Sequence, residues 1–150
     1  MVPVGLIANS DNSPNCSEGG VPPGLALVRY ADAHTKTAYA PPKGKLFVAQ
    51  RAAWRVRLAP KDGRPPADKI PFVIKPANQA NILIEESGGS TPEDDGSRWY
   101  SGSVSFGEGG IAIPGPVQDL CWTQLSFAFP LGGRDQQILV SGYEMTPPRW

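Results

Sequence analysis

Two arginines and two tryptophans are the residues of this sequence best suited to bind a partner. Arg55 and Arg57 alternate with apolar residues in the segment AWRVRL, so in an extended strand both guanidinium groups point to the same face. Trp99 shares one face of the segment RWYSGSVSF with serines, and Trp122 falls on a similarly polar face of CWTQLSFAF. A large ring among small hydroxyl groups can stack on a sugar or anchor a protein contact. We therefore predict a binding surface at these four residues, with ordinary packing under another part of the chain as the alternative.

Catalytic chemistry has little support in the sequence. His34 is the single histidine, and a serine or cysteine nucleophile usually needs a histidine base with an orienting acid. Asp32 is near His34 in the chain, but no Gly-x-Ser-x-Gly turn or recognisable active-site cysteine accompanies the pair. Phosphate-binding glycine motifs are also missing. We expect no catalytic residues, no cofactor and no enzymatic activity, and we expect His34 to lie on the surface.

The acidic segment PEDDGS raises the hypothesis of a calcium site. Glu93, Asp94 and Asp95 precede Gly96, and calcium binds clustered carboxylate oxygens. The alternating acids and closing glutamate of an EF-hand are absent. The pattern therefore favours an acidic turn over a metal site.

The cysteines and the chain's hydropathy indicate the expected environment. Cys16 and Cys121 are far apart and have no neighbouring histidines, which is not the pattern of a zinc site. The first residues contain no charged segment followed by an apolar run of signal-peptide type, and no segment is long enough for a membrane-spanning helix. We expect a protein made in the cytoplasm, not bound to a membrane, with reduced thiols. The alternative for the thiols is a disulfide between the two cysteines.

Charge is unevenly distributed along a chain whose formal net charge is zero. Residues 29–75 contain eleven lysines and arginines against three acidic residues, and the remainder contains three against eleven. The two blocks can interleave and cancel, or they can form complementary surfaces on neighbouring copies. Nucleic-acid binding is the least favoured explanation, because no aromatic RNA-binding signature accompanies the basic block.

The elements that must position these residues are short strands. Glycine and proline, at 17 residues each, separate apolar segments at roughly ten-residue spacing. The pattern predicts an all-β fold, an antiparallel β-sandwich of jelly-roll or Ig-like type with about eight or nine short strands. Residues 1–23 are expected to form an extended N-terminal arm, and residues 24–150 the sandwich domain. The strands are expected at 25–30, 45–50, 53–58, 71–76, 81–86, 99–106, 110–115, 121–129 and 137–145.

These observations predict a non-enzymatic structural protein. We expect it to pack against copies of itself or against a larger scaffold, as a virion or phage coat or decoration component does. The alternative is a carbohydrate-binding, lectin-like β-sandwich in which Trp99 or Trp122 contacts a glycan. Fold class alone does not separate these functions.

Overall fold

The computed structural model is built from antiparallel β-sheets. It describes residues 1–9, 13, 25–32, 37–60, 71–76, 83–86, 90–115, 120–124 and 136–148. Within these ranges the only helical element is the short 3-10 helix η1 (Tyr30–Asp32), so the predicted all-β class is confirmed. No helix in this part of the chain is long and apolar enough to cross a membrane.

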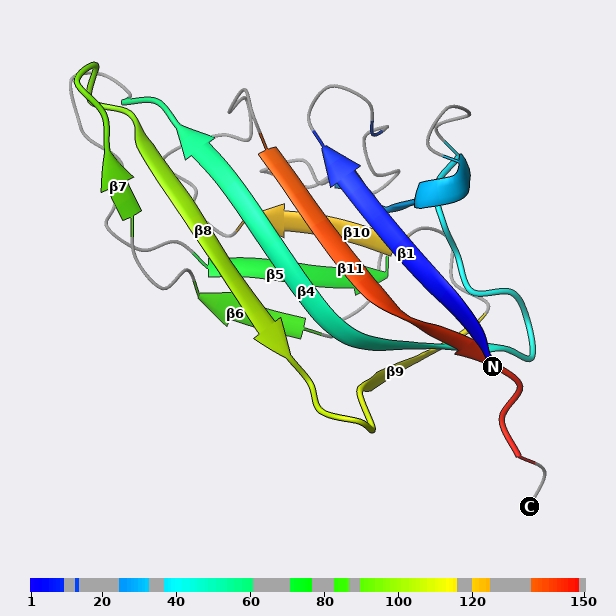
Figure 1. Ribbon diagram of the computed structural model, residues 1–150. Helices are drawn as coiled ribbons and strands as arrows, with labels where there is room; N and C mark the ends of the chain where they lie inside the picture. Colours follow the sequence, from blue (N-terminus) through cyan, green and yellow to red (C-terminus); the bar gives the residue numbers. More distant parts are fainter. Residues whose placement is uncertain are drawn as a thin grey trace.

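The described strands form two sheets (Figure 1). The large sheet has the order β3-β1-β11-β4-β8-β7, and β9 pairs with β4 beyond the end of β8. The small sheet has the order β2-β10-β5-β6 and lies behind the large sheet in Figure 1. Strands of the large sheet are β1 (Val2–Asn9), β3 (Val28–Arg29), β4 (Leu46–Leu58), β7 (Ser90–Pro92), β8 (Arg98–Ser105), β9 (Ile111–Pro114) and β11 (Gln136–Met145). Those of the small sheet are β2 (Leu25–Ala26), β5 (Pro71–Pro76), β6 (Leu83–Glu86) and β10 (Leu120–Gln124).

The longest strand, β4, replaces two strands expected from the sequence. Its partner register on β11 shifts between Ser141 and Gly142, which pair with Arg51 and Ala49 and leave Gln50 as the extra residue of a β-bulge. The bulge changes the parity of the strand. The residues of this strand in the core cluster are odd-numbered before the bulge (Phe47 and Ala49) and even-numbered after it (Ala52, Trp54, Val56 and Leu58). The change of parity explains why the alternating pattern looked like two separate elements.

The N-terminal segment is not an arm over its first residues. Strand β1 lies between β3 and β11 and pairs with β11 along its whole length. Val4, Leu6 and Ala8 are buried, so alternate side chains of this strand belong to the core. The arm was expected from the high Asn, Ser, Pro and Gly content of residues 1–23 as a whole, which outweighed the short apolar segment at residues 4–8. The remainder of residues 1–23, apart from Ser13, lies outside the described residues.

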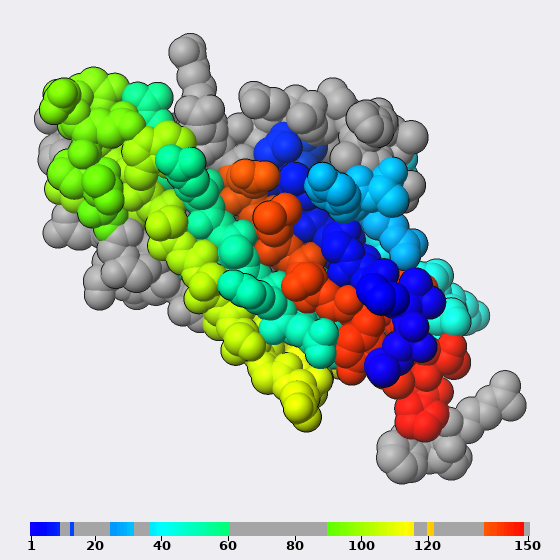
Figure 2. All heavy atoms as spheres, in the orientation of Figure 1, coloured from blue at the N-terminus to red at the C-terminus, as the bar shows by residue number. Residues whose placement is uncertain are grey.

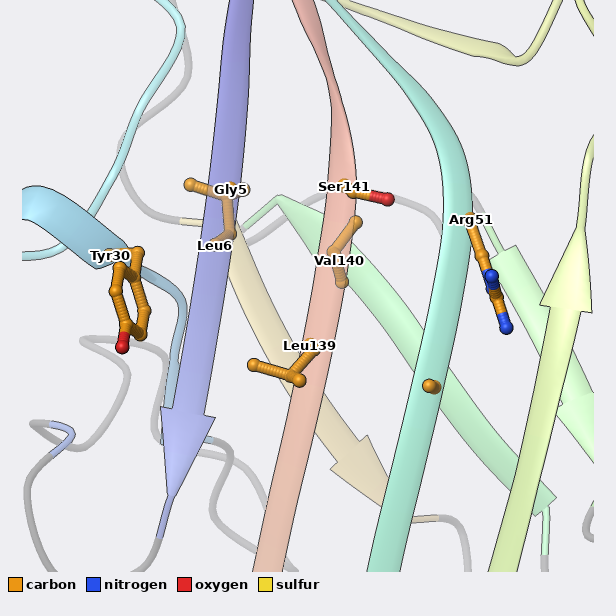
Figure 3. A pocket seen from close by; sticks show the side chains of 8 residues that line it. Gly5, Leu6, Tyr30, Arg51, Leu139, Val140 and Ser141 are labelled. Carbon is orange, nitrogen blue, oxygen red and sulfur yellow. The ribbon is translucent and has the colours of Figure 1, made fainter.

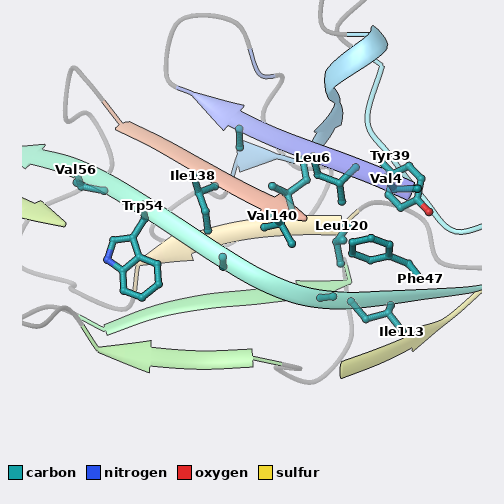
Figure 4. Close-up of a cluster of buried hydrophobic side chains, with 14 of the residues drawn as sticks. Val4, Leu6, Tyr39, Phe47, Trp54, Val56, Ile113, Leu120, Ile138 and Val140 are labelled. Carbon is teal, nitrogen blue, oxygen red and sulfur yellow. The ribbon is translucent and has the colours of Figure 1, made fainter. Parts of the chain in front are cut away.

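The hydrophobic core lies on one face of the large sheet (Figure 4). Trp54 of β4, one of the apolar residues that alternate with Arg55 and Arg57, is 6% exposed and belongs to this core. The segment RWYSGSVSF also follows its predicted alternation, since Tyr100 is fully buried whereas Ser101, Ser103 and Ser105 are exposed. One face of the large sheet is therefore packed, and the other carries the outward residues.

A partly buried hydrogen bond connects the loop before β4 to β11. The Tyr39 hydroxyl donates to Glu144 Oε2 at 2.8 Å, and the Tyr39 ring packs edge-on against Phe47 with ring centroids 5.5 Å apart. The pKa of Tyr39 is raised well above its ordinary value of 10.0, first by burial and then by the hydrogen bond and charge of Glu144. Both effects favour the neutral phenol in the folded protein.

Replacing Tyr39 with phenylalanine should lower the free energy of unfolding by about 1 kcal/mol at neutral pH. Above pH 10.0 the unfolded Tyr39 loses its proton while the folded residue keeps it, so wild-type stability falls as pH rises. The Tyr39→Phe protein lacks this loss, which amounts to at most about 1.4 kcal/mol per pH unit. Urea unfolding of both proteins at neutral and alkaline pH should show the stability difference narrowing above pH 10.0. Parallel pH profiles for the two proteins would contradict the prediction.

Cys121 differs from its expected state. It is buried in β10 and is disulfide-bonded, so the prediction of reduced thiols is wrong for this residue. The sequence holds one other cysteine, Cys16, which lies outside the described residues. Whether a thiol is bonded depends on what the fold brings beside it, and spacing along the chain does not record this.

Candidate functional site

The face of the large sheet turned away from the core, here called the outer face, is the candidate site. Figure 2 shows this face, with β1, β11, β4 and β8 side by side across it. Most of the side chains it carries on its central strands are small or are arginines. The residues of this face used below are Gly5 on β1, Leu139 and Ser141 on β11, Arg51, Ala53, Arg55 and Arg57 on β4, and Trp99, Ser101, Ser103 and Ser105 on β8.

Trp99 lies at one end of this face in a cluster of charged side chains. The Arg55 guanidinium carbon is 4.1 Å from the centroid of the Trp99 ring, within the range of a cation–π contact. The Trp99 indole N–H donates a hydrogen bond to Glu93 Oε1. One ring face and the polar edge of Trp99 are therefore engaged by the protein's own side chains.

Arg57 holds the turn between β7 and β8 against β4. Its guanidinium lies 2.9 Å from Glu93 Oε2 and 3.0 Å from Asp95 Oδ2. The pKa of the Asp95 carboxyl is lowered, first by hydrogen bonds from Ser97 and then by the charge of Arg57. Gly96 has a φ of 86°, a backbone conformation that glycine adopts easily and that reverses the chain here. The acidic turn thus pairs with an arginine of the sheet.

This pairing bears on the calcium alternative. Glu93 and Asp95 direct carboxylate oxygens at Arg57, and Asp94 is exposed. In the described part of the chain, no group of three histidine, cysteine or acidic side chains could hold a metal ion. The geometry of the segment is that of an acidic turn.

Three of the four residues predicted to bind a partner lie together. Arg55, Arg57 and Trp99 meet on the outer face because β4 and β8 pair with Arg57 opposite Trp99. Trp122 is in β10 of the small sheet, paired with Leu25 and Ile74, and its side chain lies outside the described set. The prediction for His34 also lies outside the described residues.

A hollow on the outer face was not predicted from the sequence. It has a volume of about 500 Å³ and crosses β1, β11 and β4, with Leu139 between Tyr30 and Arg51 (Figure 3). Gly5, Ala53 and Ser141 also line it. A signal for it existed in the sequence, because in the run ILV the inward positions of Ile138 and Val140 place Leu139 outward. Three consecutive apolar residues concealed this alternation.

Comparison with known proteins identified no relative, since no family model, curated protein or solved structure matches the chain.

Proposed function

We propose that this protein is a non-enzymatic structural protein that assembles, through the outer face of its large sheet, against copies of itself or a larger scaffold. The observation that carries the proposal is the exposure of Tyr30 (70%) and Leu139 (45%) beside the same hollow. Apolar side chains gathered on an open face, with arginines and small polar residues around them, are typical of a protein contact.

The charge distribution supports a contact between different surfaces of neighbouring copies. Arg51 and Arg55 are exposed on the outer face, and none of the outward residues described on β1, β11, β4 and β8 is acidic. Two such faces would repel each other, whereas a basic face attracts an acidic surface. Among the described residues outside 29–75, Asp94 and Glu108 are exposed acidic groups that such a contact on a second copy would use. Head-to-tail contacts of this kind build rings or open arrays.

The proposal also covers how the two sheets pack and the environment in which the protein works. We infer a β-sandwich, because core residues from the large sheet pack with Leu120 of the small sheet. The disulfide at Cys121 is typical of proteins that work in an oxidising environment. An assembled particle outside the cytoplasm, such as a virion, meets that condition.

A carbohydrate-binding function has weaker support. Trp99 is only half-buried, and a sugar could stack on the ring face that Arg55 leaves open. Its indole N–H is already bonded to Glu93, however, and the serines beside it offer only small hydroxyl groups. Under this alternative, Trp99→Ala abolishes retention on glycan resins and leaves the oligomer unchanged.

The test of assembly is the mass in solution, measured by light scattering at low and high salt. We expect a mass several-fold above the 16.0 kDa of one chain at low salt, decreasing at high salt as the arginine contacts are screened. Leu139→Asp should weaken association at least tenfold, because it removes about 1.5–3 kcal/mol of apolar burial and places a charge in the contact. Ala59→Asp is the control, since it adds the same charge at an exposed residue beyond the end of β4.

Two results would contradict self-assembly through this face. The first is a mass of 16.0 kDa at both salt concentrations, which excludes self-assembly and leaves only docking to a separate scaffold. The second is an oligomer that Leu139→Asp leaves intact.

A further inference from the structure

The hollow on the outer face has an apolar centre and a basic side. Gly5, opposite Ser141 of β11, and Ala53, opposite Leu139, have little or no side chain, so the backbones of β1 and β4 are approachable at these two positions. Tyr30 rises from η1 next to β1, and Arg51 rises from β4 on the opposite side (Figure 3). The volume of about 500 Å³ is within the range of sites that enclose a side chain or small ligand.

The centre of the hollow suits a large apolar side chain. Leu139 and Tyr30 expose apolar surface to the same space, and covering that surface removes it from water. The small neighbours Gly5, Ala53 and Ser141 leave room for an aromatic ring or a branched aliphatic group against the sheet.

The basic side suits a carboxylate. Of the three outward arginines on β4, Arg57 is paired with Glu93 and Asp95, and Arg55 stacks on Trp99. Arg51 lines the hollow, is exposed, and forms no ion pair with any described residue. Its planar guanidinium offers paired donors that match the geometry of a carboxylate.

We propose that this hollow is an anchor site for an acidic polypeptide segment of the assembly partner, in which a large apolar side chain adjoins an aspartate or glutamate. The apolar side chain lies between Tyr30 and Leu139, and the carboxylate pairs with Arg51. This inference rests on the proposed function and adds the chemistry of the segment that docks.

The test uses short blocked peptides observed through the methyl NMR signals of Leu139 and Ala53. The probes are acetyl-Asp-Phe-Gly-amide, its Asn-Phe counterpart and its Asp-Ala counterpart. We expect the Asp-Phe peptide to shift these signals and to bind about two- to fivefold more tightly than the Asn-Phe peptide, the range of a partly exposed ion pair. The Asp-Ala peptide should bind more weakly than either, because it leaves the apolar centre unfilled.

Matched variants separate the two parts of the site. Arg51→Gln should abolish the preference for Asp-Phe over Asn-Phe, whereas Lys43→Gln removes one positive charge from an exposed residue outside the hollow and should preserve it. Tyr30→Ala should weaken both phenylalanine peptides equally. Three results would each overturn the proposal. They are a retained preference in Arg51→Gln, equal binding of the Asp-Phe and Asn-Phe peptides by the wild-type protein, and NMR shifts confined to other parts of the sheet.

A small-molecule probe distinguishes a polypeptide ligand from a small organic acid. 3-Phenylpropionate carries the same ring and carboxylate without a peptide backbone, and it should bind more weakly than the Asp-Phe peptide. Tighter binding of this acid would overturn a polypeptide occupant in favour of a small amphiphilic acid. The peptides are titrated at a protein concentration at which light scattering gives the mass of one chain, so that no partner segment fills the hollow. A protein that is monomeric at every concentration and binds Asp-Phe contradicts self-assembly alone. A protein that forms oligomers but whose monomer ignores every probe contradicts the anchor site alone.

Discussion

Gly142→Ala is expected to destabilise the protein by on the order of 4 kcal/mol or more, a large part of the stability of a typical domain. Gly142 follows the register shift between β11 and β4, where the two backbones come very close. A Cβ atom at this position would be 1.9 Å from the carbonyl oxygen of Val48 and 2.9 Å from its carbonyl carbon. These are backbone atoms inside the sheet, so relieving the clash requires the two strands to separate.

The measurement is the midpoint of urea unfolding, with Gly5→Ala as the control. Gly5 is also a strand glycine, but a Cβ atom there meets nothing closer than Tyr30 Cβ at 3.9 Å, an ordinary contact. Gly5→Ala should therefore be neutral or stabilising by about 0.5 kcal/mol, since alanine restricts the unfolded chain more than glycine does. If the two substitutions have equal effects, β4 does not bulge at Gln50.

Gly102→Val should cost about 3 kcal/mol, near the upper end of the cost of overfilling a packed core. Gly102 of β8 lies directly opposite Trp54 of β4, and a Cβ atom there would be 2.5 Å from Trp54 Cζ2. The indole ring is buried and rigid, so it cannot rotate away without disturbing its neighbours. Gly102 thus makes the room that allows a tryptophan to pack beneath β8.

A double substitution tests this cause directly. In a Trp54→Leu background the clash is gone, so Gly102→Val should cost less than it does in wild type, and the two changes should not be additive. Ser103→Val is the control, because the adjacent residue points outward and is exposed, and it should change stability by no more than about 0.5 kcal/mol. Equal costs at Gly102 and Ser103 would show that the core and outer faces of β8 are wrongly assigned.

Alternation along single strands was readable without the structure. The shared face of Trp99 and the serines of β8, and the shared face of Arg55 and Arg57 opposite their apolar neighbours, were predicted correctly, because side-chain direction in a strand depends only on residue parity. Where the register changes, this rule fails. The extra residue Gln50 made one strand look like two, and the run from Ile138 to Val140 hid an outward leucine.

The sequence by itself determined the all-β class, the faces of the regular strands and the residue types available for binding, since these follow from local pattern and composition. Tertiary structure alone decided which of those residues meet. The β4–β8 pairing brings Arg57 to Trp99 and turns the acidic segment against an arginine, and the β1–β11–β4 order places Leu139 between Tyr30 and Arg51. The bonded state of Cys121 and the inclusion of β1 in the sheet were decided at the same level. Each depends on contacts between segments far apart in the chain, and the local periodicity of one sequence carries no information about such contacts.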